Sequence, residues 1–83
     1  MKLFKIWQDV NSGYDTYDSA VVAAKNKKQA RWIHPSSWMN GSWDGNTSKF
    51  SEWCSVQDVQ VEYLGEAKEG TKAGVIVASY DAG

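Results

Sequence analysis

Residues 20–34 read AVVAAKNKKQARWIH and place a strand pattern directly before a helix pattern. The apolar run 20–24 is typical of a strand. Asn26 can cap a helix over residues 27–34, because its side chain can accept a bond from a first-turn N–H. Pro35 ends that helix, since a residue that precedes proline disfavours the helical conformation. The stretch predicts a strand followed by a helix of about two turns.

Further strand patterns lie on both sides of this unit. Residues 3–10 and 59–63 alternate apolar and polar side chains, residues 65–74 contain turn-forming glycines, and residues 75–80 form a last apolar run. The predicted order is ββαββ, an α+β fold in which a small antiparallel sheet carries one short helix on a face. The residues expected to turn from the helix toward the sheet are Ala30, Trp32 and Ile33.

A long Trp-rich loop is expected over residues 36–53, SSWMNGSWDGNTSKFSEW, which show neither helix nor strand periodicity. Connections of this length in a small domain are commonly functional or disordered. Four of the five tryptophans lie between residues 32 and 53. Such rings either fill a thin core or contact a partner, and both interpretations stay open.

The chain has 83 residues, of which 42% are hydrophobic, and this is enough for one core and one domain over residues 1–83. Small domains often need a disulfide, a metal or self-association for stability. Cys54 is the single cysteine, so no disulfide can form within the chain, and no cysteine and histidine cluster offers a metal site. We therefore expect a homodimer or a higher homo-oligomer.

Charge and hydropathy indicate in which compartment the protein is expected and which classes of partner are not expected. No uninterrupted apolar stretch resembles a signal peptide or a membrane span, and a free thiol suits a reducing compartment, so a cytoplasmic location is expected. Residues 1–35 hold six Lys or Arg against three Asp, whereas residues 36–83 hold three Lys against seven acids. This mild asymmetry lacks the strong basic stripe of a duplex-binding protein. Neither a membrane nor a long nucleic acid is an expected partner.

The sequence offers no arrangement that would support catalysis. His34 is the single histidine and has no nucleophile motif near it. The glycines match neither a dinucleotide-binding fingerprint nor a phosphate loop. Asp15 and Asp18 could form an acid and base pair, but acids in short loops more often form turns. We expect a protein that is not an enzyme and uses no cofactor.

The residue types that remain fit a ligand with a base and phosphates. Arg31, the single arginine, could grip a phosphate, although a lone helical arginine is usually solvated or paired with an acid. His34 could donate to a phosphate, or be a histidine stabilised by the helix C-terminus. Aromatic rings near the ends of the first hairpin and of the helix could stack on a base. The predicted ligand-binding residues are Tyr14, Tyr17, Arg31, His34, Trp38 and Trp43.

Segments at both ends of the chain resemble a group of short proteins carried by bacteriophages and prophages. They are GYDTYDSAVVAA at 13–24, KKQARWIHP at 27–35, VEYLGEA at 61–67 and AGVIVASYDAG at 73–83. Proteins of this kind often act against host immunity. The resemblance implies a nucleotide sponge, similar to Thoeris inhibitors, that sequesters a cyclic ADP-ribose-type or cyclic nucleotide signal in the host bacterial cytoplasm without turnover.

A different class of function stays open beside the sponge. The chain could be a protein inhibitor that covers a bacterial immune effector, as anti-CRISPR proteins do, with residues 38–53 as its interface. A structural role in the phage has no feature in its favour. Binding of a nucleotide by the purified protein would separate the first two hypotheses.

Overall fold

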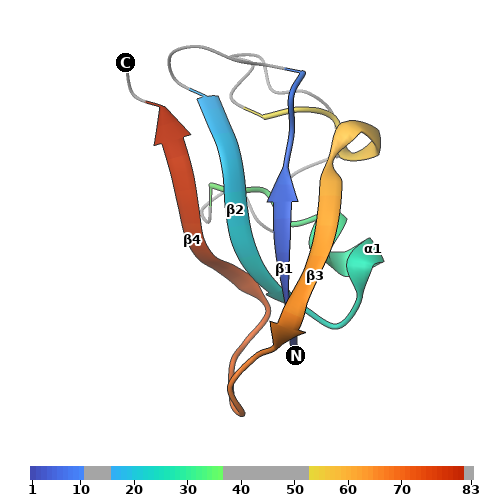
Figure 1. The fold of residues 1–83 in the computed structure, drawn as a ribbon, viewed down its shortest axis with the longest axis vertical. Coiled ribbons are helices and arrows are strands. Elements are labelled where there is room, and N and C mark those ends of the chain that lie inside the picture. Colours follow the sequence, from blue (N-terminus) through green and yellow to red (C-terminus); the bar gives the residue numbers. More distant parts are fainter. Residues whose placement is uncertain (11–15, 37–52, 82–83) are drawn as a thin grey trace.

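A computed structural model describes residues 1–10, 16–36 and 53–81 of the chain (Figure 1). They form a four-stranded antiparallel sheet in the order β3-β1-β2-β4 with one short helix, α1, on a face. The predicted antiparallel α+β arrangement with one helix is confirmed. The elements are β1 (Lys2–Trp7), β2 (Thr16–Ala24), α1 (Lys27–Arg31), the 3-10 helix η2 (Val56–Asp58), β3 (Gln60–Glu66) and β4 (Gly74–Asp81).

In the first hairpin, β2 begins earlier than its sequence predicts and β1 ends earlier. β2 begins at Thr16, four residues before the predicted start at residue 20, because Thr16 is buried and pairs with Asp81 of β4. β1 stops at Trp7 instead of residue 10, and the buried Gln8 follows it. The Gln8 side chain donates to the Tyr17 carbonyl at 2.9 Å and accepts from the N–H of Val10 at 2.9 Å. These bonds replace strand pairing at the end of the hairpin.

Asn26 caps α1 as predicted, since its Oδ1 accepts from the N–H of Gln29 at 2.8 Å. The helix ends at Arg31 and is therefore shorter than the predicted two turns. Ala30 on the helix and Ile33, just beyond its end, are both buried. The N–H of Ile33 donates to the Ala30 carbonyl at 3.1 Å. Trp32 lies between them in sequence and is 46% exposed, so the prediction that it faces the sheet is wrong. Trp32 is the C-cap of α1, so it lies after the regular turns of the helix.

One face of the sheet forms the core together with α1 and the segment before β3. Phe4 and Ile6 of β1 lie beside Val22 and Ala20 of β2, and directly paired residues share a face of the sheet. Trp53 is completely buried in the same cluster. For this tryptophan the core interpretation is correct. The rest of the buried cluster consists of Ala24, Ala30, Ile33, Cys54 and Val59.

Several predictions fall on residues that the structure does not describe. The predicted Trp-rich loop, residues 36–53, lies almost entirely within the undescribed residues 37–52, which include Trp38 and Trp43. Tyr14 lies in residues 11–15, which are outside the described part as well. None of the helices formed by the described residues has the length and apolar content that a membrane crossing requires.

Candidate functional site

Two of the predicted ligand-binding residues, Tyr17 and His34, are brought together by the fold. Their rings meet edge to face with centroids 6.2 Å apart, and Tyr17 also lies against Tyr80 of β4 at 4.7 Å. Trp53 approaches His34 at 6.5 Å from the core side. Arg31 is half buried on α1. Tyr14, Trp38 and Trp43 are not among the described residues.

The His34 imidazole is completely buried, and its Nδ1 accepts a hydrogen bond of 3.0 Å from the N–H of Ser36. Burial lowers the pKa of His34 from 6.5 to about 4, because a charged imidazolium would lose its hydration among aromatic rings. A histidine stabilised in its charged form by a helix terminus would show the opposite shift. His34 is therefore neutral at pH 7 and packs as part of the core.

A small hollow on the helix side of the sheet gathers the chemistry expected of an anion site. It has a volume of about 220 Å³ and lies between the start of β1, the start of α1 and β3. We call it the lysine hollow. Its lining residues are Lys2, Phe4, Asn26, Lys27 and Tyr63.

The Tyr63 ring in the lysine hollow is held from two sides. Phe4 packs against it edge to face with centroids 5.8 Å apart, and the Tyr63 hydroxyl donates to Oε2 of Glu66 at 2.6 Å. That hydrogen bond is the main reason why the pKa of Tyr63 is raised, so the ring stays neutral. The side chain is 48% exposed. A fixed, partly exposed aromatic ring is a preorganised stacking surface.

The charge balance of the lysine hollow favours anions. Lys2 and Lys27 contribute two ammonium groups from different elements, and both side chains are exposed. Glu66 stands opposite Lys2 in the pairing of β1 with β3, and its carboxylate is engaged by the Tyr63 hydroxyl. The two cations outnumber this one acid. Two exposed lysines beside one hollow attract an anion such as phosphate more strongly than a neutral group.

The residues that line the lysine hollow were not among the predicted ligand-binding residues: Lys2, Asn26, Lys27 and Tyr63. Their proximity depends on the antiparallel pairing of β1 with β3, which a single sequence does not show. Lys2 and Tyr63 are far apart in sequence, and only the alignment of β1 with β3 brings them to one place. Their residue types, a cation and an aromatic ring, match those of the predicted site.

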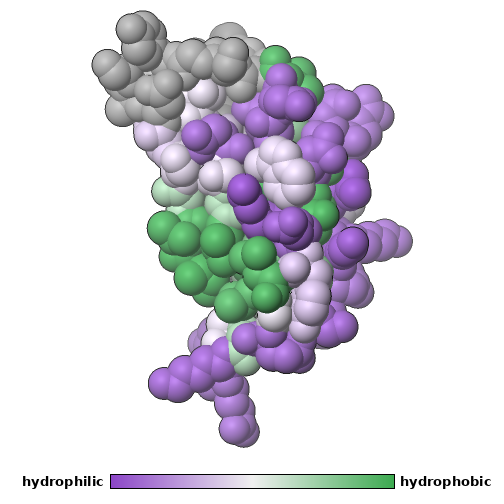
Figure 2. Space-filling view, viewed as in Figure 1, coloured by the Kyte–Doolittle hydropathy of each residue, from purple (hydrophilic) through white to green (hydrophobic). Residues whose placement is uncertain are grey.

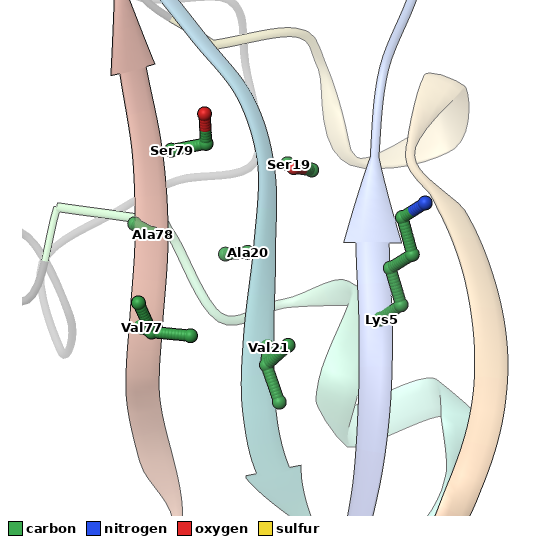
Figure 3. Close-up of a pocket in the computed structure, with 7 residues that line it drawn as sticks. All are labelled: Lys5, Ser19, Ala20, Val21, Val77, Ala78 and Ser79. Carbon is green, nitrogen blue, oxygen red and sulfur yellow. The ribbon is translucent and has the colours of Figure 1, made fainter.

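The second face of the sheet, opposite α1, has a different character. Rows of paired residues cross it, among them Lys5, Val21 and Val77 on β1, β2 and β4 (Figure 3). We call it the outer face. Exposed apolar surface gathers over β2 and β4 in Figure 2, and a shallow hollow of about 160 Å³ lies between these strands. The Lys5 ammonium sits 5.3 Å from the centre of the Trp7 ring, which holds it over β1.

Cys54 is a buried thiol in the core cluster. Burial raises its pKa to about 11, and the negative charge of Asp58 adds to the shift. Thiolate is the reactive form, so the group is inert near neutral pH. Among the described residues no three His, Cys, Asp or Glu side chains gather as a metal site would need.

We expect Cys54 in the folded protein to react with iodoacetamide at pH 8 at least tenfold more slowly than a free cysteine, because so little thiolate is present. Mass spectrometry of timed samples with and without urea measures the two rates. Urea should restore ordinary reactivity. Rapid labelling of the folded chain would show that the thiol is accessible and ionised.

No protein-family model, curated protein or solved structure matches this chain. A function is therefore inferred from the residues and their geometry alone.

Proposed function

We propose that this protein binds and sequesters a small nucleotide-type signal without turning it over, acting as an anti-defence sponge of the kind that the sequence resemblance implies. The observation that carries the proposal is the lysine hollow, which is lined by two lysine side chains and a fixed aromatic ring. This combination matches the two parts of a nucleotide. Phosphates need cations, and a base needs a flat ring.

The expected energies are large enough to matter. Stacking of one base on an aromatic side chain contributes about 1–3 kcal/mol, and a hydrogen bond to a charged group about 1.5–3 kcal/mol. Tyr63 would supply the first, and Lys2 with Lys27 the second. Together these contacts separate useful sequestration from weak, nonspecific attraction.

The size of the lysine hollow limits what it can hold by itself. At about 220 Å³ it is smaller than the roughly 300–1,000 Å³ usual for sites of drug-sized ligands. It can accommodate one base or sugar-phosphate part of a larger signal.

The test is calorimetric titration of the purified protein with cyclic ADP-ribose isomers and cyclic dinucleotides. We expect one of these probes to bind and to be recovered unchanged after the protein is denatured. Replacement of both lysines, Lys2→Ala with Lys27→Ala, should weaken binding at least tenfold, since each removes a charge-assisted contact. Tyr63→Ala should weaken it by a similar factor.

Two control variants separate the site from general effects. Lys28→Ala removes the same charge from the neighbouring helix position, which is exposed and does not line the lysine hollow, and it should leave binding unchanged. Tyr63→Phe keeps the ring and loses the hydroxyl, so stacking should persist. Equal losses in Lys28→Ala and the double variant would point to bulk charge and would contradict the assignment.

A negative result has a defined meaning for the rival hypothesis. If the parent protein binds none of the nucleotides and an immune effector co-purifies with it from the host, the sponge proposal fails. The inhibitor hypothesis, with residues 38–53 as the predicted interface, then takes its place.

A further inference from the structure

Within the described residues, β4 forms one edge of the sheet and β3 the other. The outward backbone groups of an edge strand can pair with another strand, and proteins commonly protect such edges with charges, proline or a covering element. β3 has these protections. It carries the exposed acids Glu62 and Glu66, and α1 packs beside it.

The β4 edge lacks charge over residues 74–80, GVIVASY, which also contain no proline. Ile76 and Val77 are 52% and 59% exposed, although they belong to the most apolar part of the strand. A bulge at this point sets Ile76 outside the register with β2. The apolar surface continues onto Val21, which pairs with Val77 on the outer face (Figure 2). An apolar, uncharged edge of this length is suited to pairing with a strand of another chain.

The charges at the two ends of β4 are of opposite sign, and they indicate what the contact is. The turn that leads into β4 carries the exposed Lys68 and Lys72 with one acid, Glu69. At the other end the exposed Asp18 of β2 lies beside the end of β4, which closes on the acidic residue Asp81. When two copies of one strand pair antiparallel about a twofold axis, the start of each lies beside the end of the other.

We propose that the β4 edge is the interface for a second copy of this chain, joined by antiparallel pairing of the two β4 strands. This pairing places the lysine end of each copy beside the acidic end of its partner, and it brings Ile76 and Val77 against apolar cross-strand neighbours of the partner's β4. The two sheets become one continuous sheet. The proposal concerns a different surface from the lysine hollow, so it stands or falls independently of the ligand.

Sedimentation of the full-length chain over a range of concentrations tests the interface. We expect the mass of two chains, 9.3 kDa each, with dissociation on dilution. Val77→Lys should raise the dissociation constant at least tenfold, because like charges would meet near the twofold axis. The matched control is Leu64→Lys on β3, an equally apolar position that is 49% exposed on the opposite edge, and it should leave the dimer intact.

Hydrogen exchange provides a second measurement that needs no variant. Amides of β4 in the unmodified chain should be protected at high protein concentration and should exchange faster on dilution, while those of β1 stay protected. A chain that is a monomer at every concentration, or a dimer that persists in a folded Val77→Lys variant, would overturn the proposal.

Discussion

Trp53→Ala is expected to remove most of the stability of the fold. Trp53 is completely buried in the core cluster and packs against the ring of His34. Truncation of a buried tryptophan to alanine costs about 3–5 kcal/mol, since the cavity cannot fully collapse. A small domain has a total stability at the low end of about 5–15 kcal/mol. Urea titration followed by far-ultraviolet circular dichroism measures the loss.

Trp32→Ala provides the matched control, because it removes the same ring from a position that is 46% exposed. Its effect should stay near the roughly 0.5 kcal/mol typical of surface substitutions. The difference between the two variants measures burial rather than aromatic content. Equal destabilisation would mean that Trp53 does not fill the core as described.

Acidification is expected to weaken the fold through His34. The pKa of His34 is about 4 in the folded chain and 6.5 without burial. Between these two pH values the unfolded chain therefore binds more protons than the folded chain. Stability is therefore fully present above pH 6.5 and is lost as the pH falls toward 4. A shift of this size corresponds to about 3 kcal/mol. Protonation of Nδ1 would also break its bond from the Ser36 N–H.

Comparison of the parent chain with His34→Gln isolates this contribution. Carboxylates also titrate near pH 4, and the variant reports their share alone. The decrease in the urea midpoint from pH 7 to pH 4 should be much larger for the parent chain than for His34→Gln. Parallel decreases in the two proteins would show that the imidazole is not the buried neutral group described above.

Local patterns predicted the parts of this fold that depend on local physics. Alternation and short apolar runs located the strands, and Asn26 marked the start of α1 because a cap is a contact between near neighbours. The order β3-β1-β2-β4 was beyond such patterns, since any of several antiparallel orders satisfies the same alternation. The early start of β2 was missed for a related reason. Thr16 owes its place in the strand to pairing with β4.

The candidate site shows the same division between local and distant effects. His34 was predicted as the last residue of the helix, but it lies beyond the end of α1 at Arg31. Its burial depends on Tyr17 and Trp53, which come from other parts of the chain. The lysine hollow joins Lys2 to Tyr63 across a strand pair. A single sequence contains these residue types without their distances. The residue types therefore suggested a ligand chemistry, whereas the hollow itself depends on strand pairing that a single sequence does not show.

The central position of β1 has a consequence for the speed of folding. Its neighbour β3 is separated from it by β2 and α1 along the chain, so the middle of the sheet closes only when distant segments meet. Proteins dominated by such nonlocal contacts fold in about milliseconds to seconds, far more slowly than small helical bundles. The same holds for β4, whose partner β2 also lies far away along the chain. Refolding at high protein concentration is thus a competition between pairing of β4 with β2 and irreversible aggregation through β4.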